Sequence, residues 1–268
     1  MNRARNIAIG VLAAVFAVSL LANLFAPAPY AMQFRDFVNA PASHQFWLGT
    51  DELGRDRWSR LLYGTRISLL LAPAAALLST LTAVLIGGVA GYLGGWWDRI
   101  VLRVIDIFLS IPWIFLFLIV RALLPLNTSP LASVILTFLV MGLLGWASSA
   151  RIIRAGAQSL RQSDLVLHAR ACGVRGGRLL FVHIVPNLKP VVLAQFWISI
   201  PTFILGEASL GLIGLGVGEP LPSWGNLLRE LANPQAAWSH PWMLAPLIVL
   251  VIVMSCFQFL LSQREFAA

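Results

Sequence analysis

Few side chains in this chain of 268 residues have the types and spacing that catalysis requires. The four histidines show no paired spacing typical of a metal site, and neither Cys172 nor Cys256 has the features of a nucleophile. The single lysine, Lys189, is followed by Pro190, so the sequence lacks the Gly-x-x-x-x-Gly-Lys-Ser/Thr loop that binds nucleotide phosphates. We therefore expect no catalytic residue, no cofactor-binding residue and no metal ligand on this chain, and no enzyme activity of its own.

The segment Asp51–Asp56 holds three carboxylates and could bind a cation. Its spacing is not that of an EF-hand loop. The same residue types are equally suited to a turn followed by a helix whose first turn is capped by an aspartate. We favour this structural interpretation over a cation site.

The composition indicates which elements position these side chains. Apolar residues make up 59% of the chain and charged residues 11%, with a mean hydropathy of +0.82. Soluble domains carry about 25% charged residues, so a soluble globular protein is excluded. Two cysteines cannot build a disulfide framework, and strands of alternating polarity are absent from the sequence. We predict an all-α, polytopic membrane protein.

Six segments are long and apolar enough to cross a bilayer, for which a helix needs about 20 residues. They are Ile7–Phe25, a span within Ile67–Trp97, Ile107–Leu124, Leu131–Ala150, Pro190–Val217 and Trp242–Leu261. The first could instead be a cleaved signal peptide, but it is longer than the usual apolar region of one. We expect an N-terminal transmembrane helix (1–26), an extracytoplasmic segment with an interfacial helix over Arg57–Ser68 (27–67), and a five-helix core (68–268).

Basic residues predict the orientation of these spans. With the N-terminus in the cytoplasm, 12 basic residues fall on inner segments and 7 on outer segments, whereas four acidic residues lie inside and six outside. The positive-inside rule therefore favours both termini in the cytoplasm. Seven of the inner basic residues lie in one segment, 151–189, so the net charge of +8 is concentrated there.

Glu207 is the one acidic residue deep inside a long apolar stretch. Carboxylates within a membrane are costly and usually face protein or a water-filled path. Glu207 lies about 18 residues beyond Lys189, or about 27 Å along a helix, which places it near the outer boundary. It could hydrogen bond to a neighbouring helix, which we favour, or contact a solute. The nearby Gly211, Gly214 and Gly216 suit a gate that bends, or ordinary close packing of helices.

The inner segment 151–189 begins with a basic helical face. Arg151, Arg154 and Arg161, together with Gln158, recur at helical spacing, so the fourth span is expected to continue beyond the membrane. This face could be a stripe of side chains that snorkel towards the lipid surface, which we favour, or a docking face.

A compact knob is predicted to follow this helix. Ser163 and Asp164 suit a helix start, Gly173 suits a left-handed cap, and a second helical stretch, Arg178–Ile184, runs to Pro186. We expect that such a knob is too small to fold alone and needs the bilayer or a docked protein to bury its apolar side.

Residues Leu167–Gly173, followed by His183–Asn187, resemble the EAA loop of permease subunits of binding-protein-dependent ABC importers. Gly173 and Pro186 are 13 residues apart, as in that family, whereas Leu167 and His168 replace the family's glutamate and first alanine. In the family this loop supplies the coupling helix that sits in a groove of the ATPase subunit. The resemblance implies an ATPase-coupling role for Ser163, Asp164, Ala169, Arg170, Ala171, Gly173, Ile184 and Pro186.

Three further motifs, in the expected order, are similar to those of the second permease of dipeptide, oligopeptide and nickel systems. They are Phe46–Arg66, Gly94–Pro112 and Glu207–Gly216, the last leading into Pro222–Asn226. The resemblance also implies a type I importer fold and a path or gate role for Glu207, Gly211, Gly214 and Gly216.

The resemblance implies a multi-pass protein of the bacterial inner membrane that works within a complex. Its expected partners are a homologous permease, two ATPase subunits that hold the ATP and magnesium, an extracytoplasmic solute-binding protein and the lipid bilayer, with no nucleic acid. The solute would be a peptide or a related small solute, nickel included. The alternative is a component of an ion-gradient-driven secondary transporter, which predicts several midplane ionisable groups and an internal repeat, neither of which is evident.

Overall fold

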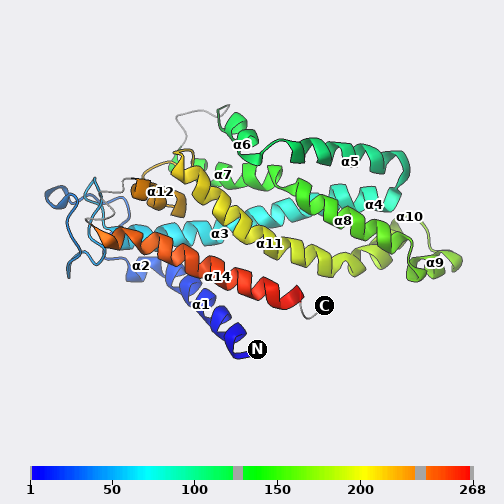
Figure 1. Ribbon diagram of the computed structural model, residues 1–268, viewed down its shortest axis with the longest axis horizontal. Helices are drawn as coiled ribbons and strands as arrows, with labels where there is room; N and C mark the ends of the chain where they lie inside the picture. The colour runs from blue at the N-terminus through cyan, green and yellow to red at the C-terminus, as the bar shows by residue number, and fades with distance from the viewer. Residues whose placement is uncertain (1, 123–128, 233–239, 266–268) are drawn as a thin grey trace. The chain divides into compact units, whose positions relative to one another are not determined.

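The computed structural model describes residues 2–122, 129–232 and 240–265, and within these ranges the chain forms helices, turns and loops without a strand (Figure 1). The expectation of an all-α fold is confirmed. Five helical runs are long and apolar enough to cross a membrane, and a bent pair of helices makes up to six. The runs are Arg3–Leu20, Arg57–Leu93, Pro130–Arg161, Gly176–Leu212 and Pro241–Ser262.

Several of these runs combine shorter elements. In chain order the elements are α1 (Asn2–Leu20), α2 (Ala22–Phe25), η1 (Arg35–Phe37), α3 (Arg57–Ala83), the π-helical η2 (Val84–Gly88), α4 (Val89–Leu93), α5 (Gly95–Ser110), α6 (Trp113–Ala122), α7 (Pro130–Leu144), α8 (Trp146–Arg161), α9 (Asp164–Ala171), α10 (Gly176–Arg178), the π-helical η3 (Leu179–Ile184), α11 (Val185–Leu212), α12 (Trp224–Arg229), η4 (Glu230–Ala232), η5 (Pro241–Leu244) and α14 (Ala245–Glu265).

The chain divides into two compact units, and the division falls inside α3, α7 and α11. Unit 1 comprises residues 1–72, 125–137 and 201–268, and unit 2 comprises residues 73–124 and 138–200. In unit 1, α1 packs along α14, and α12 also contacts α14. In unit 2, α8 packs against η2, α4 and α5, and contacts α9 and η3 near its end.

Glycines allow α8 to approach the run from η2 to α4 closely. A Cβ atom at Gly87 would lie 2.4 Å from the carbonyl oxygen of Ala150, and one at Gly91 would lie 2.4 Å from that of Arg154. The two glycines are one helical turn apart and so lie on the same face. Because apolar residues gain little by leaving lipid for a helix interface, such close packing is a main source of attraction between membrane helices.

The third predicted span is not one straight helix. Instead of a helix over Ile107–Leu124, α5 ends at Ser110 and α6 begins at Trp113, and the two are bent by 86°. Ile111 has an extended backbone (φ −93°, ψ 123°). The ring of Pro112 disfavours a helical conformation at the residue before it, which explains the break.

The interfacial helix expected over Arg57–Ser68 is not a separate element. Residues 57–68 form the first turns of α3, which continues without a break to Ala83. Arg57 and Arg60, which lie on these first turns, are both buried. The fourth span does continue beyond Ala150, through α8 to Arg161, as predicted.

We predict that Gly87→Ala destabilises the protein by about 1–3 kcal/mol, because the added Cβ would overlap a backbone atom of α8 that cannot rotate away. The neighbouring Gly88→Ala is the matched control, since its nearest atom would lie 3.8 Å away and alanine favours a helix. Thermal unfolding of both variants in detergent tests this. Equal unfolding temperatures would contradict it.

Candidate functional site

The predicted knob is a short helix closed by a glycine cap. Helix α9 begins after Ser163, whose backbone is extended (φ −73°, ψ 153°). At its other end Gly173 has φ +84° and donates its N–H to the carbonyl of Arg170, while Val174 donates to that of Ala169. These two bonds form a Schellman motif. The predicted helix start and left-handed cap are confirmed.

The knob, residues 163–184, buries one apolar face within the chain. Val166 and Ala169 of α9 form a core with Leu179 and Ile184 of η3. The core also contains one residue from α8, Ala157, and one from α11, Leu188. The expectation that this side needs a bilayer or a docked protein to cover it is therefore wrong, since the end of α8 and the start of α11 cover it.

The residues predicted to couple to an ATPase divide into two groups. Ala169 and Ile184 are buried in the core of the knob, whereas most of the others face outward. The exposed members are Asp164, Arg170, Ala171, Gly173 and Pro186, and Ser163 is half-buried. The outer face of α9 also carries Leu165 and Leu167, which are about half exposed (48% and 51%).

Pro186 does not end a helix, contrary to prediction. The chain stays helical from Gly176 through η3 into α11, and Pro186 lies in the first turn of α11. Within a regular α-helix a proline removes one hydrogen bond and crowds the carbonyl four residues earlier. The wider π-helical turn just before Pro186 changes this bonding pattern, and the helix continues.

The arginines of the basic face of α8 are paired with neighbouring helices rather than forming the unpaired, lipid-facing stripe that we favoured, although Arg151 remains about half exposed (47%). Arg154 forms an ion pair with Asp98, and Arg151 forms one with Asp106, both on α5. Arg161 donates to the carbonyl oxygen of Leu93 at 3.0 Å. The docking interpretation is not supported for these side chains either, because their polar groups are engaged within unit 2.

Glu207 lies fully buried at the centre of a network in unit 1. Its Oε2 accepts hydrogen bonds from the Ser68 hydroxyl of α3 (3.3 Å) and from the Gly225 N–H at the start of α12 (3.4 Å). The Ser68 hydroxyl also accepts the N–H of Trp224, whose indole donates to Thr65. The favoured hydrogen bond to a neighbouring helix is confirmed. A role in the path or gate stays a prediction.

The glycines near Glu207 fasten α12 to α11. A Cβ atom at Gly211 would lie 2.2 Å from the Cα of Gly225, and one at Gly216 would lie 2.7 Å from the Cα of Gly211. Gly214 (φ +80°) and Leu215 close α11 with a second Schellman motif, which ends the fifth span at Leu212 rather than Val217. Sequence reasoning missed Gly225, because only the fold brings it against α11.

A second polar network lies before α3. The Arg55 guanidinium contacts Asp51 (2.7 Å) and Glu219 (2.6 Å), and Arg60 contacts the same two carboxylates (3.6 and 3.2 Å). Burial of Arg55 disfavours its charged form, but Asp51 and Glu219 outweigh this effect and raise its pKa. The network ties the segment before α3 to the loop that follows α11.

Two of the three carboxylates in Asp51–Asp56 are structural, as predicted, whereas the third, Glu52, is exposed. Asp51 accepts the N–H groups of Leu53 and Arg55 and so closes a turn. Asp56 caps α3 by accepting the N–H of Ser59 at 2.8 Å. No group of three or more histidine, cysteine or acidic side chains suits a metal ion in the ranges that the structure describes.

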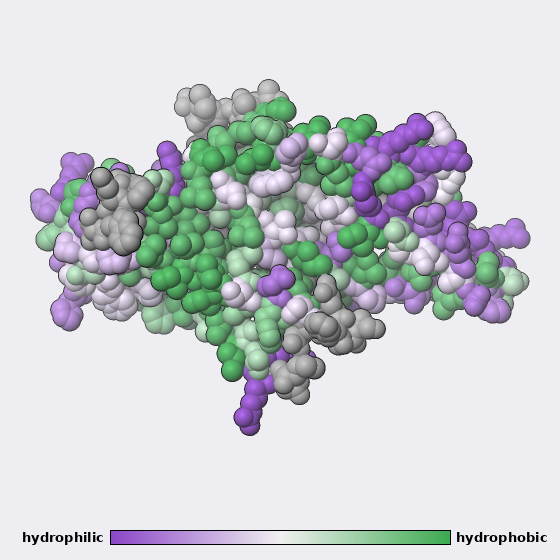
Figure 2. All heavy atoms as spheres, viewed as in Figure 1, coloured by the Kyte–Doolittle hydropathy of each residue, from purple (hydrophilic) through white to green (hydrophobic). Residues whose placement is uncertain are grey.

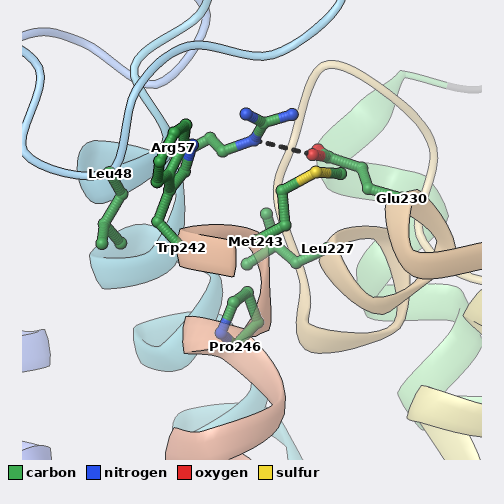
Figure 3. Close-up of a pocket in the computed structure, with 7 residues that line it drawn as sticks. All are labelled: Leu48, Arg57, Leu227, Glu230, Trp242, Met243 and Pro246. Atoms are coloured by element: carbon green, nitrogen blue, oxygen red, sulfur yellow. Dashed lines mark hydrogen bonds and ion pairs between the residues drawn. The ribbon is translucent and has the colours of Figure 1, made fainter. Parts of the chain in front are cut away.

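A small pocket beside this network is closed by a further ion pair. Arg57 donates to Glu230 at 3.0 Å, and apolar side chains from three other segments line the pocket on one side of the pair (Figure 3). These side chains are Leu48, Leu227, Trp242, Met243 and Pro246. Burial raises the pKa of Glu230, which the charge of Arg57 offsets only in part.

Comparison with known proteins supports a single family. Residues 83–265 match the family described as "Binding-protein-dependent transport system inner membrane component". The chain is 34% identical to the oligopeptide transport system permease protein OppC of Bacillus subtilis, over 86% of this chain and 74% of that protein. It is 32% identical to the dipeptide transport system permease protein DppC of Bacillus subtilis (87% and 71%) and 31% identical to OppC of Haemophilus influenzae (97% and 82%).

We predict that Glu207→Leu destabilises the protein by about 2–4 kcal/mol, because it leaves the Ser68 hydroxyl and the Gly225 N–H buried without their acceptor. Glu207→Gln keeps a carbonyl acceptor and should cost less. Ser209→Ala, at an exposed position on the same helix, is the control. Thermal unfolding in detergent ranks the three variants. An unchanged unfolding temperature for Glu207→Leu would show that the network contributes little to stability.

Proposed function

Because the chain belongs to the family of inner membrane components of binding-protein-dependent transport systems, we propose that it lines, together with a homologous permease, the path of a peptide importer. The chain is a multi-pass permease subunit of the inner membrane. Its relatives are named as permeases for oligopeptides and dipeptides, which supports a peptide as the solute. Delivery by an extracytoplasmic solute-binding protein fits the name of the family.

The shared core of the knob supports coupling between an ATPase subunit and the membrane helices. Val166 and Ala169 of α9 share one buried cluster with Ala157 of α8 and Leu188 of α11. A displacement of α9 therefore cannot occur without moving the ends of both longer helices, since a packed core transmits shifts rather than absorbing them. The knob is suited to act as a lever between an ATPase subunit and the membrane helices.

The outer face of α9 is suited to receive such a subunit. Leu165 and Leu167 are half exposed on the outward side of α9, and Arg170, three residues after Leu167 and so next to it on the helix, is exposed as well. The outward side therefore combines apolar area with positive charge. We propose that ATP-driven closure of two ATPase subunits pulls on this face. The ATP and magnesium belong to those subunits, in line with the absence of a phosphate-binding loop from this sequence.

Ion pairs make α8 a stiff arm for this motion. Arg151 and Arg154 hold α8 to α5, and Arg161 binds the last carbonyl of α4. Force applied at the knob would then move α4, α5 and α8 as one packed group within unit 2. Shifts of packed helices past one another are a known type of conformational change and could produce alternating access.

We propose that the knob and both termini lie on the cytoplasmic side of the membrane. The excess of basic residues on 151–189 supports a cytoplasmic knob and both termini in the cytoplasm. The segment between α2 and α3 would then face the periplasm or cell exterior, where it would meet the solute-binding protein. Within it, Arg55 and Asp51 hold the polypeptide rigidly against the loop that carries Glu219.

We predict that Gly173→Val lowers solute-stimulated ATP turnover of the reconstituted importer at least tenfold. A β-branched residue is strained at φ +84° and would distort the end of α9. Gly95→Val is the matched control, because Gly95 also has positive φ (+63°) and open space around it but lies outside the knob. The chain should remain inserted in both variants.

Three outcomes would distinguish a failure of the coupling role from general destabilisation and from a failure of the proposed function. Unchanged turnover with Gly173→Val would refute the coupling role of the knob. An equal loss with both variants would assign the effect to general destabilisation. Wild-type protein that neither associates with an ATPase subunit nor stimulates it would refute the proposed function itself.

A further inference from the structure

The outward face of α5 carries an ordered stripe of aromatic, basic and apolar side chains. Trp96, Arg99, Arg103 and Ile107 follow one another at helical spacing and are all exposed, with Trp96 at 70% and Ile107 at 60%. Ile105, on the opposite face, is fully buried in the core of unit 2. The stripe is therefore the side of α5 that turns away from the rest of unit 2.

Both carboxylates of α5 form ion pairs with α8 and not with the arginines of the stripe. Asp98 forms its ion pair with Arg154 of α8, and Asp106 with Arg151. Among the residues that the structure describes, no carboxylate lies within ion-pair distance of Arg99 or Arg103. Two like charges four residues apart on a helix repel one another. An external anion bound between Arg99 and Arg103 would therefore stabilise α5.

The surface next to these arginines is suited to a bilayer. Beyond Arg103, α5 and the start of α6 expose Ile107, Leu109, Ile111 and Trp113. Figure 2 shows hydrophobic surface along this side of unit 2, giving way to hydrophilic surface towards the turn between α4 and α5. Trp96 and Trp97, which lie at that turn, pack edge to face and are both exposed. Exposed tryptophans at the end of an apolar surface are typical of the membrane–water interface.

We propose that the Trp96–Ile107 face of α5 binds an anionic phospholipid, with its phosphodiester between Arg99 and Arg103. Side chains four residues apart have Cβ atoms about 5–6 Å apart, so both guanidinium groups can reach one phosphate. Guanidinium groups bind phosphate oxygens through paired N–H donors. Trp96 would lie at headgroup depth, and Ile107 would contact the acyl chains.

A lipid explains more of this face than a soluble anion does. A free phosphate would complement the two arginines but would leave the adjacent tryptophan and isoleucine without a partner. The proposal concerns the membrane around unit 2, so it goes beyond the transport role and does not depend on the identity of the solute.

The test uses the full chain in phosphatidylcholine nanodiscs that contain increasing fractions of phosphatidylglycerol with brominated acyl chains. Bromine quenches nearby tryptophan fluorescence, and a variant with Trp96→Phe and Trp97→Phe gives the background from the other tryptophans. We expect quenching at low fractions in the wild type. Arg99→Gln with Arg103→Gln should raise the half-quenching fraction about thirtyfold, since each arginine near a charged lipid surface contributes about 1 kcal/mol.

The control variant removes the same charge elsewhere. Arg175→Gln with Arg178→Gln alters two exposed arginines of the knob, outside α5, and should leave the half-quenching fraction unchanged. An equal shift in both double variants would show general attraction to charged lipid and would overturn the proposal. Thermal unfolding checks that each variant stays folded, and native mass spectrometry of retained phosphatidylglycerol gives an independent readout.

Two further outcomes would also overturn it. Displacement of the lipid by millimolar inorganic phosphate would show that the arginines form a site for soluble anions. Loss of the quenching when the chain is assembled with its partner subunits would show that this face is covered by protein. Retained quenching under both conditions, together with its loss on replacing Arg99 and Arg103, would support the lipid site.

Discussion

Direct contact between helix backbones at glycine is the constraint on which both units depend. In unit 2 the run from η2 to α4 meets α8 at Gly87 and Gly91, where a side chain would overlap a carbonyl oxygen. In unit 1, α11 meets α12 where Gly211 faces Gly225. Lipid chains solvate leucine as well as a protein core does, so these contacts, rather than the hydrophobic effect, fix which helices are neighbours.

Close backbone contact also determines where polar groups can be buried. Once α12 lies against α11, the N–H of Gly225 comes within reach of Glu207, and Ser68 of α3 completes the set. Once α8 lies against α5, Arg154 reaches Asp98. Burying a charge costs several kcal/mol unless a partner is present, so each pair both requires the packing and makes any other packing unfavourable.

The sequence predicted features that depend on local signals. The length of the apolar runs identified the spans, Ser163 and Gly173 marked the ends of α9, and Asp56 marked the start of α3. These signals lie within a few residues of the feature that they determine, so no tertiary information was needed. Glu207 was recognised because an acidic residue within an apolar run needs a partner, although its partners Ser68 and Gly225 could not be named.

Two of the errors share one physical cause, because they concern side chains whose partners lie far away in the sequence. Arg151 and Arg154 were expected to face lipid because their carboxylate partners lie on another helix. The knob was expected to lack a core of its own because Ala157 and Leu188, which complete that core, lie outside it. The break between α5 and α6 is different, since Pro112 signals it locally and the apolar run around it concealed the signal.

The arrangement in unit 2 explains how a small knob could control long helices. Ion pairs consume the carboxylates of α5 and hold α8 along it, while glycine contacts hold α8 to α4. Under the proposed coupling, a knob whose core is shared with α8 and α11 would act on a rigid assembly rather than on one flexible helix. The same ion pairs leave Arg99 and Arg103 without a carboxylate partner among the residues that the structure describes. The ion pairs between α5 and α8 therefore have two consequences. They hold α5 and α8 together as one stiff unit, and they leave the outward face of α5 positively charged.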